Sequence, residues 1–123
     1  MSLCRACLDT NAASVCDHAA VDHCTAQINC GDKKFYALVA TEVLNSGDNW
    51  EIDWLKDGVS IHADNGIKLE GCELAFLVST FPVDTAMFSD CNHQWTVQFV
   101  VNSTVLLTQG FTFASQTANC QCP

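Results

Sequence analysis

Basic residues are scarce in this chain of 123 residues. Five Lys and Arg stand against fourteen Asp and Glu, which gives a formal net charge of −9. A protein without a basic patch displaces few counterions from phosphates, so we expect no nucleic-acid partner. The same shortage disfavours an anionic membrane surface, whereas the acidity itself favours solubility or a cationic partner.

Long apolar runs are missing as well. None approaches the roughly 20 residues that a membrane-spanning helix needs, so we expect no membrane span. The opening segment, MSLCRACLDT, has neither the basic nor the apolar region of a signal peptide. If the protein is secreted, we therefore expect its signal peptide to have been removed.

Recognisable catalytic motifs are also lacking. No serine stands in a G-x-S-x-G context, and no His occurs in a motif that marks it as a general base. Glu51 and Asp53 share one face of a predicted strand and form a carboxylate pair of the kind that flanks a sugar, but an exposed acidic face explains them equally. We expect no enzymatic activity and no cofactor.

Cysteine, by contrast, is abundant. Its usage far exceeds that of ordinary proteins and indicates either an oxidising compartment or a metal site. We expect disulfides in a secreted, extracellular protein. The odd number leaves one thiol that is free, bound to metal, or paired with a second chain in a homodimer, and the pairing is not readable from the sequence. The disulfide candidates are Cys4, Cys7, Cys16, Cys24, Cys30, Cys72, Cys91, Cys120 and Cys122.

Metal sites are the alternative use of these cysteines. Cys4-x-x-Cys7 and Cys120-x-Cys122 together offer four thiolates, the donor set of a structural zinc site. A small zinc-stabilised protein is therefore one alternative interpretation. The oxygen donors between Asp48 and Asn65 suggest calcium, but their spacing fits no EF-hand. We favour disulfides and predict no metal.

The strongest structural pattern is a hairpin over residues 95–113. Trp95, Val97 and Phe99 alternate with polar residues, and a second alternating run ends in Phe111 and Phe113 after a polar turn. Period-two alternation predicts strands with one buried face. Similar patterns predict strands at 24–30, 50–56, 59–63 and 72–81, and residues 35–44 are apolar on both faces, as in a central strand.

Turn residues separate these strands at short intervals. Asp57-Gly58 and Asp64-Asn65-Gly66 both predict tight turns, because Gly, Asn and Asp tolerate positive φ. Strands at such spacing favour an antiparallel β-sandwich or barrel. We predict an all-β, antiparallel, disulfide-stabilised β-sandwich over residues 24–123. Residues 1–23 are expected to form a short helical or irregular Cys-rich arm packed on this single domain.

Two segments are similar to immunoglobulin-type domains. Residues 54–61, WLKDGVSI, resemble the C-strand segment of that family, and Asp84, Phe88 and Cys91 resemble the corner before its second cysteine. The resemblance implies an immunoglobulin-like or related sandwich.

Loops on a rigid sandwich are the usual recognition surface. We therefore predict a recognition module that binds a protein or carbohydrate partner through loops 45–49, 56–58, 63–66 and 82–94. The alternative is a secreted inhibitor or effector, including an immunomodulatory protein, acting on an enzyme or receptor. Trp50 and Trp54 belong to the core by default, and they become a ligand platform if their face is open. The binding-loop candidates are Asp48, Asn49, Asp57, Asp64, Asn65 and Asp84.

The segment Asn102-Ser103-Thr104 is an N-glycosylation sequon. It falls on the tip of the predicted hairpin, where a glycan is tolerated. We therefore expect a glycoprotein modified at Asn102.

Overall fold

The computed structural model describes residues 1–4, 27–28, 34–40, 42, 44–68, 76–84, 87 and 93–113. These residues are mostly β-strands in two sheets, and they contain no helix. The all-β prediction is confirmed. Among the same residues there is accordingly no helix long and apolar enough to cross a membrane.

The smaller sheet has three antiparallel strands. They are β1 (Ser2–Cys4), β3 (Lys34–Ala40) and β6 (Phe76–Pro82), in the order β1-β3-β6. β3 is central, which explains why its sequence is apolar on both faces. The expectation of an irregular start to the chain is wrong for Ser2–Cys4, because this segment pairs with Tyr36 to Leu38 of β3. Three residues are too short for an alternation pattern to show.

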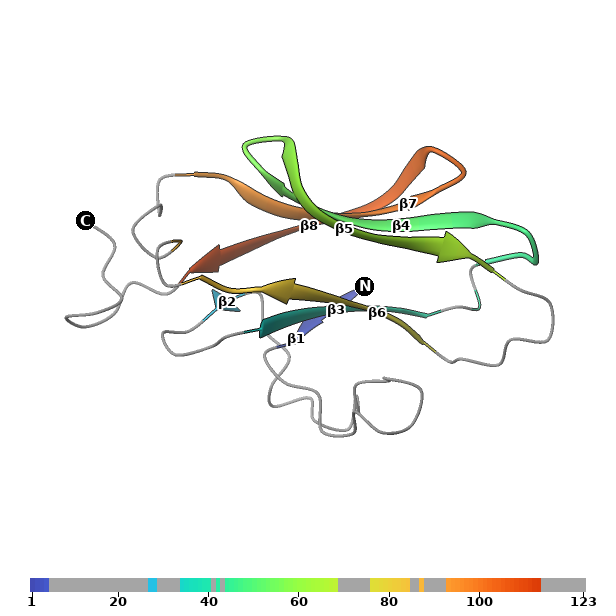
Figure 1. The fold of residues 1–123 in the computed structure, drawn as a ribbon, viewed down its shortest axis with the longest axis horizontal. Coiled ribbons are helices and arrows are strands. Elements are labelled where there is room, and N and C mark those ends of the chain that lie inside the picture. The colour runs from blue at the N-terminus through green and yellow to red at the C-terminus, as the bar shows by residue number, and fades with distance from the viewer. Residues whose placement is uncertain are drawn as a thin grey trace.

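The larger sheet has five strands in the order β2-β8-β7-β4-β5. Its members are β2 (Gln27–Ile28), β4 (Asn49–Lys56), β5 (Val59–Ile67), β7 (Trp95–Val101) and β8 (Thr104–Phe113). All neighbours pair antiparallel except β2, which runs parallel to β8 at Thr112 and Phe113. Figure 1 shows the two sheets as layers, with β3 and β6 on one side and β4, β5, β7 and β8 on the other.

The predicted hairpin over residues 95–113 is confirmed as β7 and β8. Trp95, Val97 and Phe99 are buried, as their alternation predicts. On β8 only Phe111 and Phe113 are buried. The register shifts between Phe99 and Val100, so the first half of β8 does not keep the expected pattern.

The two predicted turns have different outcomes. Asp57 and Gly58 adopt φ of 51° and 80° and form the tight turn between β4 and β5, as expected. The turn predicted at residues 64–66 is wrong, because β5 continues to Ile67 and Asn65 pairs with Glu51 of β4. The local composition signals a turn, but the ladder with β4 decides the conformation.

One apolar core is shared by the two sheets. The smaller sheet contributes Leu3, Phe35 and Phe81, and the larger sheet contributes buried residues from β2, β4, β7 and β8. Trp54 of β4 lies fully buried among aromatic rings, with centroid distances of 4.8 Å to Phe81, 5.5 Å to Phe111 and 6.1 Å to Phe35. Trp54 is therefore a core residue, as the default interpretation has it, and is not a ligand platform.

Candidate functional site

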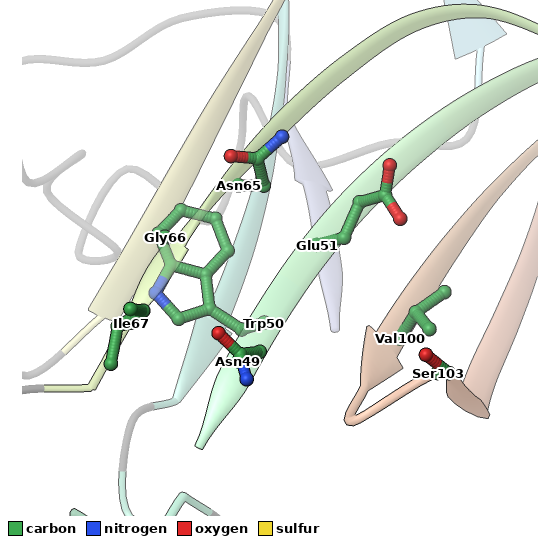
Figure 2. A pocket seen from close by; sticks show the side chains of 8 residues that line it. All are labelled: Asn49, Trp50, Glu51, Asn65, Gly66, Ile67, Val100 and Ser103. Carbon is green, nitrogen blue, oxygen red and sulfur yellow. The ribbon is translucent and has the colours of Figure 1, made fainter. Parts of the chain in front are cut away.

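An open groove of about 700 Å³ crosses β4, β5 and the hairpin turn of β7. Its register partners explain its composition: Asn49 pairs with Ile67, and Glu51 pairs with both Asn65 and Val100. Because paired residues of neighbouring strands share a face, these side chains lie opposite to the core residues Ile52 and Trp54. Figure 2 shows the lining residues, which are Asn49, Trp50, Glu51, Asn65, Gly66, Ile67, Val100 and Ser103.

Polar side chains of the groove have no partner within the described part of the chain. Asn49 uses its backbone N–H, not its carboxamide, to bond Asn102, and neither Glu51 nor Asn65 makes a side-chain hydrogen bond there. Two carboxamides, a carboxylate and the Ser103 hydroxyl are thus available to a ligand. Carboxamides both donate and accept, and a carboxylate accepts from hydroxyl groups.

Trp50 and Gly66 form a cross-strand pair that also lines the groove, although the Trp50 side chain has the parity of the core residues Ile52 and Trp54. The indole lies over Gly66 in Figure 2, and a Cβ built at Gly66 would stand 2.9 Å from Cζ2 of Trp50. That approach is too close for any side chain, so the absence of one at position 66 fixes where the ring lies. Trp50 is partly buried against the core. It therefore shapes the groove without being an open platform.

The β7–β8 turn closes one end of the groove. Asn102 and Ser103 have φ of 49° and 67°, the pair of positive values that defines a type I′ hairpin turn. The Oδ1 atom of Asn102 accepts from the backbone N–H of Asn49 at 3.0 Å, and its own N–H donates to the Asn49 carbonyl at 2.8 Å. These two hydrogen bonds between Asn102 and Asn49 hold the turn, and with it Ser103, at the groove.

Asp48 secures the same end from the loop before β4. Its carboxylate accepts from the backbone N–H of Asn45 at 2.8 Å and from Nδ2 of Asn102 at 3.0 Å. These two hydrogen bonds, the backbone one first, lower the pKa of Asp48 below its ordinary value. The Asp48 carboxylate is therefore used in hydrogen bonds within the protein and is not a free binding group. The second hydrogen of Asn102 Nδ2 leaves glycosylation of this sequon chemically open.

Asp57 performs a comparable role at the opposite end of β4. Its carboxylate accepts from the Gln94 backbone N–H at 2.8 Å and contacts Nδ1 of His93 at 2.5 Å, and its own N–H donates to the Gln94 carbonyl. The bond from Gln94, followed by that from His93, lowers the pKa of Asp57. This clasp joins the β4–β5 turn to the start of β7.

A chain of hydrogen bonds at the core links Trp54, Ser79 and Asp64, and His62 lies beside it. Trp54 Nε1 donates to Ser79 Oγ at 2.7 Å, and Ser79 donates to Asp64 Oδ2 at 2.6 Å. His62 Nε2 lies 3.5 Å from the same carboxylate oxygen. In a nucleophilic triad the histidine stands between serine and carboxylate. Here the serine contacts the carboxylate directly and is fully buried, so it ties the sheets together.

The binding-loop candidates separate into two groups. Asn49 and Asn65 line the groove, although Asn65 lies within β5 and not in a loop. Asp48, Asp57 and Asp64 hold the scaffold, and the Asp84 carbonyl accepts from Met87 N–H at 2.9 Å. Gly66 belongs to the predicted binding loop 63–66, whereas sequence reasoning did not place Ile67, Val100 and Ser103 at a binding site, since only the strand pairing brings them together.

The cysteine sites lie almost entirely outside the described residues. Only the backbone of Cys4 is described, as the end of β1, so the disulfide candidates, the zinc alternative and residues 5–23 of the predicted arm all fall outside. Within the described ranges there is no group of three or more His, Cys, Asp or Glu placed to hold a metal ion.

Comparisons of the chain with protein-family models, curated proteins and solved structures give no match.

Proposed function

We propose that this protein is a secreted recognition module that binds a neutral, hydroxyl-rich ligand, a glycan, in the groove on the outer face of β4, β5 and β7. The observation that carries this proposal is the set of unpartnered carboxamide, carboxylate and hydroxyl groups beside apolar side chains in one groove. Small-ligand sites combine apolar walls with a few convergent polar groups in this way. The groove volume of about 700 Å³ suits a short oligosaccharide better than one monosaccharide.

Charge disfavours an anionic ligand. Glu51 is the acid at the groove, and the chain carries a net charge of −9. An anionic ligand such as a sulfated or sialylated sugar would meet repulsion from this field. Hydroxyl groups, which donate to carboxylates and exchange hydrogen bonds with carboxamides, suit the four polar groups present.

The scaffold in this proposal is a disulfide-stabilised, immunoglobulin-like β-sandwich. Two features support it: the two sheets share one core, and the order β8-β7-β4-β5 matches the G-F-C-C′ order of variable-type immunoglobulin sheets. Trp54 then corresponds to the buried tryptophan of strand C. β3 and β7 contain no cysteine, so aromatic rings pack on Trp54 where that family has its inter-sheet disulfide. The nine cysteines would crosslink other segments, as expected for an extracellular protein.

Binding to an array of neutral and charged glycans, followed by calorimetry on the hits, tests the function. Glu51→Gln and Asn65→Ala are each expected to weaken binding about tenfold or more, because each removes hydrogen bonds to the ligand. Asp53→Asn is the matched control, since Asp53 lies on the same face of β4 but accepts from Ser60 and does not line the groove. A blank array, or equal losses in all three variants, would overturn the proposal.

A further inference from the structure

Strand β8, whose outer side meets β2 only at Thr112 and Phe113, carries an exposed apolar strip. Val105, Leu106 and Leu107 are consecutive, and their side chains are 49%, 49% and 42% exposed. Val105 pairs with Val100 and Leu107 with Phe99, so these two side chains lie on opposite faces of the sheet and both border the outer side of β8. Exposed aliphatic side chains along an open strand edge favour pairing with another chain. We call these three residues the β8 strip.

The backbone beside the strip is also open. In the described part of the chain, residues 104–109 pair only with β7, because β2 meets β8 at Thr112 and Phe113 alone. The open stretch ends at Gly110, because the Gly110 carbonyl already accepts a hydrogen bond from Nε2 of Gln109 at 3.2 Å. An edge of this kind offers a row of N–H and C=O groups to another strand. The free edge thus lies next to the β8 strip.

The distribution of charge along the chain favours a second copy of this chain as the partner of the β8 edge. From Cys91 to the last residue the chain contains no Asp, Glu, Lys or Arg, so the whole net charge of −9 resides in residues 1–90. The opposite edge of the same sheet, β5, carries Asp64 and follows Asp57. The edge of the smaller sheet at β6 ends in Pro82, which has no N–H to donate to a further strand, and Ser79 of β6 contacts the Asp64 carboxylate. The β8 edge is therefore where two copies of this acidic chain approach with least repulsion.

We propose that β8 is a self-association surface at which two copies of this chain pair edge to edge about a two-fold axis, burying both β8 strips. An isologous contact places the same patch on both subunits, and antiparallel pairing of identical neutral edges satisfies that requirement. The contact is non-covalent and does not use the odd cysteine. It goes beyond glycan binding and does not depend on it, although a dimer presents two grooves and so increases avidity.

The interface is small, so the dimer is weak. Three half-exposed side chains and one strand edge bury less than the roughly 800 Å² per partner of a standard interface. The register shift at Leu106 shortens the regular part of the edge further. We expect a reversible dimer with a dissociation constant in the micromolar range or above.

Sedimentation velocity over a concentration series tests this proposal on the full chain with its native cysteine state. Leu106→Lys is expected to raise the dissociation constant tenfold or more, because it places a charge at the centre of both strips. Ile67→Lys is the matched control: Ile67 is 58% exposed, but it lies on the β5 edge. Val105→Lys serves if circular dichroism shows that Leu106→Lys has not folded.

Hydrogen exchange provides a second readout. The amides of residues 104–109 are expected to gain protection as the concentration of wild-type protein rises, whereas those of β5 do not. Monomer at every concentration would overturn the proposal, as would a dimer that survives denaturation without reductant. The same holds for a dimer that Ile67→Lys weakens as much as Leu106→Lys, or one that leaves exchange at 104–109 unchanged.

Discussion

The indole nitrogen of Trp54 donates a 2.7 Å hydrogen bond to Oγ of Ser79, and this bond joins the five-stranded sheet to the three-stranded sheet inside the core. Both side chains are fully buried. Neither group has water as an alternative partner, so the loss of Ser79 Oγ leaves Trp54 Nε1 unsatisfied, whereas Ser79 also donates to Asp64. The bond therefore fixes how β4 and β6 face each other.

Replacing Ser79 with Ala is expected to destabilise the protein by about 1–3 kcal/mol, because Trp54 Nε1 then remains buried without an acceptor. Urea unfolding followed by Trp fluorescence measures the change in free energy of unfolding. Ser60→Ala is the control: it removes a serine bond to Asp53 at an exposed position, and we expect an effect below about 0.5 kcal/mol. Equal effects in the two variants would contradict the role assigned to Ser79.

Gly66→Ala is expected to displace the Trp50 indole, since the new Cβ would lie 2.9 Å from Cζ2. Overpacking of this kind costs about 1–3 kcal/mol. The same substitution in a Trp50→Leu background should cost clearly less, because the ring that it meets is gone. A double-mutant cycle in urea, with near-ultraviolet circular dichroism on each variant, measures this coupling. Additive effects would show that the two residues do not meet.

Acid is expected to weaken the fold through Asp48 and Asp57. Hydrogen bonds lower the folded-state pKa of both groups, from Asn45 and Asn102 in the first case and from Gln94 and His93 in the second. A lowered folded pKa contributes stability that is present above the unfolded pKa and is lost as pH falls through the folded value. The loss therefore begins near pH 4 and continues below it. Asp57→Asn should flatten this dependence in unfolding curves taken from pH 6 to pH 2.

The Asn102 turn gives a fourth prediction. Asn102→Ala loses two side-chain hydrogen bonds and places Ala at φ of 49°, whereas Asn102→Gly loses the same bonds without backbone strain. We expect Ala to be the more destabilising by about 1 kcal/mol or slightly more. Thermal unfolding of the unglycosylated variants measures the difference. Equal melting temperatures would mean that the positive φ carries no cost here.

Much of the fold is predictable from the sequence because alternation reports directly on burial. Trp95, Val97 and Phe99 are buried as their period indicates, and Asp57-Gly58 turns as its chemistry requires. The same local reasoning fails at residues 64–66, where Gly66 serves the approach of Trp50 and not a turn. A glycine looks the same in the sequence whether it provides a positive φ or an empty space.

The groove was beyond reach of the sequence for a different reason. Glu51, Asn65 and Val100 meet only because β4 pairs with both β5 and β7 in one register. Alternation assigns each residue to a face, but it does not say which strands are neighbours. The carboxylates of the loop candidates Asp48 and Asp57 instead accept hydrogen bonds from backbone N–H groups of the protein itself.

The central claim is that the groove on β4, β5 and β7 binds a neutral glycan, and amide chemical-shift mapping during titration tests it most directly. The titrant is the neutral oligosaccharide that binds best on the array. We expect saturable shifts concentrated at residues 49–51, 65–67 and 100–103, and their loss in Glu51→Gln. Saturable shifts confined to other surfaces, or no saturable shifts with any neutral oligosaccharide, would contradict the account.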